Sequence, residues 1–117
     1  MDERLRYVAA AIALAHSNER NIRSVYSYTD SKYYSVDVKI DDDRVKGFDY
    51  TENHHFDGRM PNLYHYGMSN HFQFKNKGDG RYSGIDYSKN CHFGVTVRSK
   101  SADLYDYGVG SYFSFSL

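Results

Sequence analysis

Five pairs of residues recur along this chain at a constant separation of six positions, and their types could support metal binding or acid–base chemistry. The pairs are Ser27 with Tyr33, Asp49 with His55, His65 with His71, Asp86 with His92, and Asp106 with Tyr112. Imidazole suits divalent Zn, Ni or Cu, and a carboxylate beside an imidazole can make a base near neutral pH. If the members of each pair face each other on neighbouring strands, they form a row across a sheet.

The same row has a simpler interpretation. Asp–His and Tyr–Asp pairs are ordinary cross-strand contacts on a solvated sheet face, worth about 0.2–1 kcal/mol each. A flat sheet rarely brings ligands together in a tetrahedron, and the chain has no Cys-x-x-Cys or His-Glu-x-x-His spacing. We therefore expect no cofactor and treat His55, His71 and His92 as weak metal candidates.

The single cysteine, Cys91, lies next to His92 and near Asp86, which invites a nucleophile–base–carboxylate interpretation. Adjacent residues of a strand point to opposite faces, however, so Cys91 and His92 are predicted on opposite sides of the sheet. A buried structural thiol is the expected role of Cys91. His54, by the same alternation, is predicted to lean toward the apolar face near its rim.

These pairs belong to an internal repeat, which predicts the elements that position them. Each copy contains a Tyr-x-Tyr pair or a variant of it. A further aromatic residue follows six positions after the second residue of that pair. The five copies are VYSYTDSKYYSV from Val25, GFDYTENHHFDG from Gly47, LYHYGMSNHFQF from Leu63, GIDYSKNCHFGV from Gly84 and LYDYGVGSYFSF from Leu104. Polar and glycine-rich segments separate the copies, so each copy is predicted to form a β-hairpin.

A three-residue hairpin loop with a left-handed third residue would fit the motif. The third positions are Ser31, Asn53, Ser69, Asn90 and Gly110. In that register Tyr105 lies opposite Phe113, and directly opposed residues share a face. The sequence then predicts a buried face carrying the Tyr-x-Tyr pairs and a wet face carrying the Asp and His residues. The odd spacing of 21 between two copies is expected to be absorbed by an even-numbered turn at Gly78-Asp79.

The N-terminal stretch from about Asp2 to Ser17 is predicted to be a helix with Asp2 as its N-cap. It is apolar on all sides from Tyr7 to Ala15, which is typical of a helix enclosed by other elements. At about 24 Å it is too short to span a bilayer. The alternative is a secretory signal over residues 1–15, although Asp2 and Glu3 offset its positive charges.

The predicted fold is mainly β with one N-terminal helix in a single domain, residues 1–117. The helix occupies residues 1–18, and five β-hairpin repeats occupy residues 24–117. Ten strands at about 4.8 Å form a sheet far wider than one helix about 10 Å across can cover. We expect an antiparallel meander curled around the helix. The alternative is an open sheet stacked on a second copy in a homodimer.

The composition limits the classes of partner that we expect the protein to bind. The chain has thirteen Tyr, seven Phe and zero formal net charge, so no general field would attract nucleic acid or an acidic membrane. We predict a non-enzymatic, cytoplasmic binding or assembly module, or a secreted one if residues 1–15 are removed. Its polar sheet face would recognise carbohydrate or peptide, and its two sheet edges would favour a homo-oligomer. The alternative is a metal-binding protein or metal-dependent enzyme that uses the Asp/His row. The ligand-binding candidates are Tyr33, Asp49, His55, His65, His71, Asp86, His92, Asp106 and Tyr112.

Overall fold

The computed structural model describes all 117 residues as one helix and ten strands. The helix α1 spans Glu3–Ser17. The strands are β1 (Ile22–Ser27), β2 (Lys32–Asp41), β3 (Arg44–Asp49), β4 (His54–Arg59), β5 (Asn62–His65), β6 (Asn70–Gly78), β7 (Arg81–Asp86), β8 (Cys91–Arg98), β9 (Ser101–Asp106) and β10 (Ser111–Ser116). The prediction of a helix followed by ten short strands is confirmed.

The strands form a closed antiparallel barrel in which each strand pairs with its neighbours in the chain. Closure comes from β1 and β10, where Tyr26 pairs with Ser116 and Ser27 with Phe115. The sheet therefore has no free edge, and the alternative of an open sheet stacked in a homodimer is wrong. The edges that we expected to favour self-association are paired with each other, so the predicted homo-oligomer loses that argument and stays a prediction.

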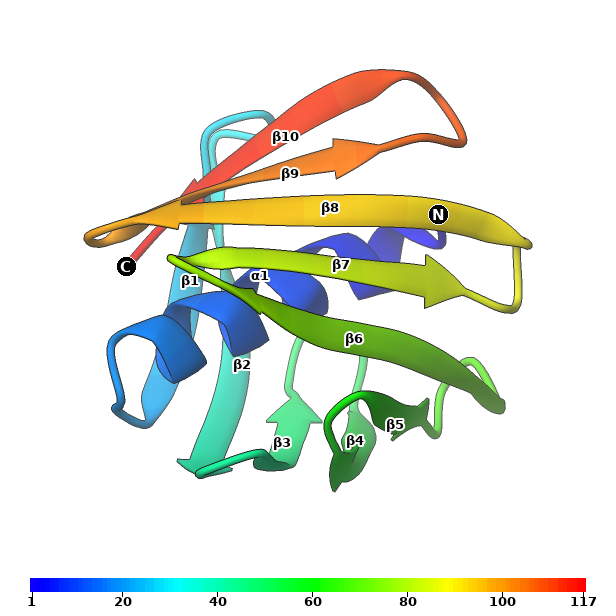
Figure 1. The fold of residues 1–117 in the computed structure, drawn as a ribbon, viewed down its shortest axis with the longest axis horizontal. Helices are drawn as coiled ribbons and strands as arrows, with labels where there is room; N and C mark the ends of the chain where they lie inside the picture. Colours follow the sequence, from blue (N-terminus) through cyan, green and yellow to red (C-terminus); the bar gives the residue numbers. More distant parts are fainter.

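The helix α1 fills the barrel (Figure 1). Asp2 is its N-cap, as predicted, and its carboxylate accepts a hydrogen bond from the Arg4 N–H. Leu5 and all residues from Tyr7 to Ala15 are buried, so every side of the helix faces the inner wall. Small alanine side chains give α1 the narrow profile that lets ten strands close around it. The apolar stretch within residues 1–15, for which a secretory signal is the alternative interpretation, thus forms the centre of the barrel core.

The largest fully buried side chains of the inner wall are phenylalanines. Phe56, Phe72, Phe74 and Phe93 are fully buried and point inward. Two glycines, Gly47 and Gly84, lie opposite Phe56 and Phe93 on the neighbouring strands. A Cβ on either glycine would overlap the facing phenylalanine ring, so the missing side chains provide the space that these rings occupy.

The turns between hairpins are short and lie where the sequence placed them. Each contains two residues, at positions 42–43, 60–61, 79–80 and 99–100. The turn after Gly78 thus has the even length that we expected, but all the other turns between hairpins have the same length. The odd spacing between the third and fourth copies is absorbed instead by a register shift in β6, between Asn76 and Gly78.

Candidate functional site at the hairpin-loop end of the barrel

The loop within each hairpin contains four residues, not the three that we predicted. The loops are residues 28–31, 50–53, 66–69, 87–90 and 107–110. Their last residues, Ser31, Asn53, Ser69, Asn90 and Gly110, all have positive φ, so the predicted left-handed positions are confirmed. The extra residue comes from the first strand of each hairpin, which ends one position earlier than expected.

This one-residue difference reverses the face of the first strand in every hairpin. Tyr105 pairs with Tyr112 on the outside, and Phe113 pairs with Leu104 on the inside. The Tyr-x-Tyr pairs therefore point outward, and the residue between them points into the barrel. The predicted faces of the second strands are correct, because Phe56, Phe72 and Phe93 are buried.

None of the five predicted cross-strand pairs forms. Ser27, Asp49, His65, Asp86 and Asp106 lie inside the barrel and are fully buried. Their expected partners lie on the outside and are exposed: Tyr33, His55, His71, His92 and Tyr112. The Asp/His row proposed as a metal or acid–base site is therefore wrong, and no group of three or more His, Cys, Asp or Glu side chains could hold a metal ion.

The inward residues instead bind the backbone of their own loops. The Asp49 carboxylate accepts hydrogen bonds from the Thr51 and Glu52 N–H groups, at 2.9 and 3.3 Å. Asp86 accepts from Ser88 and Lys89 in the same way. The corresponding donors are Gly108 N–H to Asp106, Met68 N–H to His65 Nδ1, and Asp30 N–H to Ser27 Oγ. This side chain-to-backbone turn explains why the loop needs four residues.

Three of these carboxylates also hold the N-terminal end of α1. Asp86 accepts a hydrogen bond of 2.7 Å from the Asp2 N–H, and Asp49 accepts one from the Tyr7 hydroxyl. Asp106 forms an ion pair with Arg6 at 3.1 Å and also contacts the Met1 ammonium. Negative charge at a helix N-terminus is favourable because the helix dipole is positive there.

The pKa values of two of these carboxyl groups move in opposite directions. Burial raises the pKa of Asp49, and the neutral hydrogen-bond donors around it only partly oppose that rise. Burial acts in the same direction at Asp106. There, hydrogen bonds from the Met1 ammonium, Gly108 and Arg6 outweigh it, and the pKa is lowered. Buried carboxylates at this end are thus held charged where a cation is present.

The five inward residues, Ser27, Asp49, His65, Asp86 and Asp106, are called the inner ring below. His65 is the one imidazole among them. Its Nε2 is buried and has no hydrogen-bond partner, while Nδ1 accepts from the Met68 N–H. Burial, with a contribution from nearby Arg4, lowers the pKa of His65 to about 4. The neighbouring His54 also points inward, as predicted, with its ring centroid 6.2 Å from that of His65. Both rings therefore lie on the opposite side of the barrel wall from the exposed candidates His55 and His71.

Cys91 has the predicted orientation, opposite to that of His92, but its side chain is only partly buried. It pairs with Asp86 across β7 and β8 and packs against the core, whereas His92 lies on the outside opposite Ile85. The thiol and the imidazole are therefore on opposite sides of the wall. Cys91 is a structural residue at the rim of the barrel.

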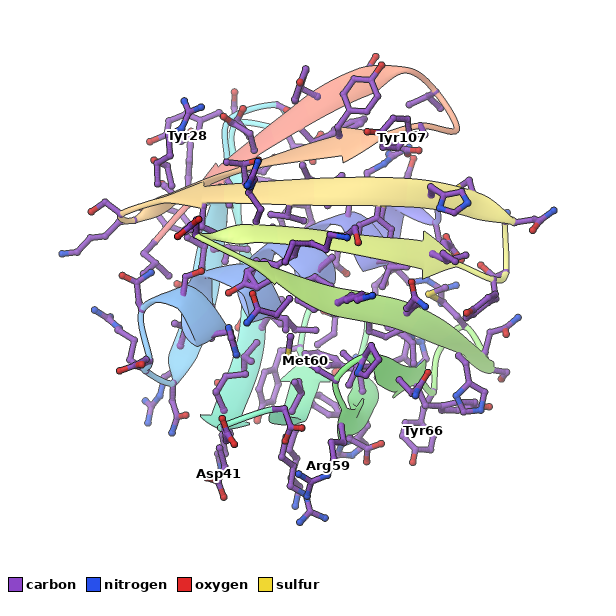
Figure 2. All side chains as sticks on the ribbon, viewed as in Figure 1. Tyr28, Asp41, Arg59, Met60, Tyr66 and Tyr107 are labelled. Carbon is purple, nitrogen blue, oxygen red and sulfur yellow. The ribbon has the colours of Figure 1, made fainter.

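The outer surface at the same end carries aromatic clusters that repeat with the hairpins. In the fifth hairpin, the Tyr105 ring lies 4.7 Å from both Tyr107 and Tyr112 in edge-to-face geometry. The loop tyrosines are 47–64% exposed, and Figure 2 labels three of them, Tyr28, Tyr66 and Tyr107. Equivalent clusters are Tyr26/Tyr28/Tyr33, Phe48/Tyr50/His55 and Tyr64/Tyr66/His71. In the fourth hairpin the corresponding residues are Ile85, Tyr87 and His92.

One part of this surface is hollowed. An open groove of about 1100 Å³ crosses the outside of β7–β10. Aromatic rings line one end, a charged and hydroxyl-bearing row lines the other, and a glycine lies between them. The exposed and outward-facing residues that line it are Lys77, Arg81, Ser83, His92, Gly94, Thr96, Asp103, Tyr105, Tyr107 and Tyr112.

Gly94 makes this groove, and the fold does not require a glycine there. Its Cα pairs regularly with Ser83 and Tyr105 in the middle of a sheet, without a bulge. A Cβ on Gly94 would have the Tyr82 carbonyl oxygen, at 3.6 Å, as its nearest heavy-atom neighbour, which is an ordinary contact. A glycine inside a strand weakens the sheet and often marks a bulge, a bend of a barrel strand, or a place where a ligand or another backbone approaches closely. We therefore take the groove around Gly94 as the candidate binding site.

Sequence reasoning found part of this site. Tyr112 and His92 were ligand candidates and line the groove, whereas Tyr105, Tyr107 and Gly94 were missed. A signal for the correct face was present: Ser, Asp or His precedes every loop, and each can accept loop N–H groups, as in Asx-turns. That pattern predicts the inward orientation of the residue and the outward orientation of the two aromatic neighbours.

Comparisons with protein-family models, with curated proteins and with solved structures find no significant match to this chain. α1, the one helix, does not combine the length and the apolarity that crossing a membrane requires.

Proposed function

We propose that this protein is a non-enzymatic carbohydrate-binding module, and that the groove over β7–β10 is its binding site. The observation that carries the proposal is the arrangement around Gly94. A cluster of edge-to-face tyrosine rings and a row of hydrogen-bonding side chains border a strand position that has no side chain.

The two ends of the groove match the two parts of a sugar ring. A pyranose has an apolar C–H face and a polar rim of hydroxyl groups. Tyr105 and Tyr112 offer large apolar surfaces at one end. At the other end Arg81, Thr96 and Asp103 are cross-strand neighbours in one row. They supply hydrogen-bond donors and acceptors, as ligand sites with few, well-placed polar groups do.

A peptide fits this surface less well. Extended peptides often bind by adding a strand to an exposed sheet edge. The barrel has no such edge, because β1 and β10 pair with each other. A peptide would have to bind through side chains alone. The absence of a free edge favours a ligand that binds through ring faces and hydroxyl groups.

Calorimetric titration with maltose, laminaribiose, cellobiose and diacetylchitobiose, supported by a glycan array, tests the proposal. We expect at least one disaccharide to bind, and Gly94→Val to abolish binding because its side chain would occupy the strand position between the aromatic rings and the polar row. Tyr112→Ala should lower the affinity by about tenfold, equivalent to about 1.4 kcal/mol of lost contact.

Tyr33→Ala is the matched control. Tyr33 occupies the same hairpin position as Tyr112, with 69% against 68% exposure, but lies outside the groove. It should leave disaccharide affinity unchanged. No sugar binding in titration or on the array would overturn the proposal. So would binding of a library peptide in the groove without any glycan signal.

A further inference from the structure

Strand pairing places the aromatic clusters of successive hairpins next to one another beyond the groove. In three places a histidine lies between a residue of its own hairpin and the loop tyrosine of the next hairpin. His55 pairs with Phe48, and its carbonyl accepts the Tyr66 N–H at 3.0 Å. His92 pairs with Ile85, and its carbonyl accepts the Tyr107 N–H at 3.1 Å.

The third histidine follows the same rule. His71 pairs with Tyr64, and the pairing of Phe72 with Asp86 places Tyr87 next to His71. Each histidine row is two strands further around the barrel than the last, which is about 10 Å. Together with Tyr105 and Tyr112 these rows form a continuous surface over β3–β10, which we call the Tyr/His band.

The band is interrupted at the first hairpin. Tyr50 of the second hairpin lies next to Ser35, and its N–H donates to the Ser35 carbonyl. On the other side the Tyr28 N–H donates to the Ser114 carbonyl. A serine therefore stands at both junctions where the other hairpins have a histidine. The Tyr26/Tyr28/Tyr33 cluster is isolated from the rest.

We infer that the Tyr/His band binds successive units of one glycan chain, so that the ligand is a polymer and the groove is its best-defined subsite. The inference rests on the proposed carbohydrate function. Ligand units that leave the groove past His92 meet Ile85 and then the row of Tyr87 and His71. Binding several linked units raises the effective concentration of each, so affinity rises with chain length.

The curvature of the barrel narrows the class of glycan. The band follows a convex wall, and the molecule is only about 28 Å across. A straight, ribbon-like chain touches a convex surface along one row, whereas a chain that bends can follow several. The geometry therefore favours glycans with bending linkages, such as α-1,4- or β-1,3-glucans, over β-1,4-glucans.

Titration of the full chain with di- and hexasaccharides tests this inference. For maltohexaose or laminarihexaose we expect at least a tenfold gain in affinity over the matching disaccharide, and for cellohexaose less than threefold. Tyr64→Ala combined with His71→Ala should remove most of the hexasaccharide gain. The same double variant should leave disaccharide affinity unchanged, because both residues lie outside the groove.

Tyr33→Ala, on the isolated cluster, is the control and should change neither affinity. Disaccharide binding without a length effect would overturn the polymer inference and leave the groove assignment intact. An equal gain for cellohexaose would overturn the argument from curvature. Equal losses from Tyr33→Ala and the band variant would show that the band is not the extended site. Failure of every sugar to bind would instead remove the proposed function itself.

Discussion

The inner and outer surfaces at the hairpin-loop end are built from adjacent residues, yet their side chains make different kinds of contact. Inside, Asp49, Asp86 and Asp106 accept hydrogen bonds from loop backbone and from α1. Outside, the tyrosines between and beside them contact mostly one another and solvent. The fold thus requires an acceptor at each inward position, but it requires no particular side chain at the outward ones. The first loop residue is nevertheless a tyrosine in all five hairpins, and the requirements of the fold do not explain that repetition.

The largest effect should come from removing an inward carboxylate. Asp86→Ala takes the acceptor from the Asp2, Ser88 and Lys89 N–H groups. Because hydrogen bonds to a charged group contribute about 1.5–3 kcal/mol each, we expect a loss of about 4 kcal/mol in unfolding free energy, measured by urea titration. Asp86→Asn keeps one oxygen acceptor and should lose less. A loss below 1 kcal/mol for Asp86→Ala would refute the structural role of the inner ring.

The second effect separates His65 from the aspartates. In the unfolded chain an imidazole binds a proton below about pH 6.5, whereas His65 in the barrel binds one only near pH 4. The contribution of neutral His65 to the unfolding free energy is therefore fully present above about pH 6.5. It is lost as the pH falls toward 4, by about 3 kcal/mol in total. Urea titrations at several pH values should show this slope. His65→Asn, which keeps an acceptor for the Met68 N–H, should have a shallower one, and an unchanged slope would assign the acid sensitivity to other groups.

Two glycines of the same hairpin sharpen the contrast between the surfaces. Gly84→Ala places a methyl group against the Phe93 ring and the Gln73 carbonyl, and we expect a loss of about 2 kcal/mol. Gly94→Ala points outward into open space and should change stability by less than about 0.5 kcal/mol. The midpoints of thermal or urea unfolding measure both. Equal destabilisation by the two variants would mean that Gly94 is structural, and it would remove the main support for the groove.

The smallest effect on stability should come from a loop tyrosine. Tyr87 is 47% exposed, and Tyr87→Ala should change the unfolding free energy by about 0.5 kcal/mol or less. The same variant should lower the affinity for maltohexaose or laminarihexaose, because Tyr87 belongs to the Tyr/His band. A stability loss above about 1.5 kcal/mol would indicate that the outward tyrosines hold the barrel together.

Much of the fold could be read from the sequence, because it depends on features with local signals. The apolar stretch from Tyr7 to Ala15 predicts an enclosed helix, and the repeat predicts the hairpins and the left-handed loop residues. Register was not predictable from hydrophobicity alone. Tyrosine is large enough to look like a core residue and polar enough to face water. An error of one residue in loop length therefore placed Asp86 and Tyr87 on the wrong sides together.

The candidate site depended on that register, so it was predicted only in part. His92 and Tyr112 were correctly placed outside, since the second strand of each hairpin was oriented by its buried phenylalanine. The groove could not be foreseen, because it results from Gly94 lying between strands whose pairing must be known first. Closure of the sheet was also beyond local reasoning, since it depends on contacts between Tyr26 and Ser116 at opposite ends of the chain.

The order of elements in this barrel has a consequence for its biosynthesis. The helix that fills the interior is translated before any strand, and the strand that completes the enclosure, β10, is translated after all the others. An apolar segment thus leaves the ribosome long before its surroundings exist. Since contacts between distant parts of a chain slow folding, closure of the barrel around this segment has to wait until the fifth hairpin has been released.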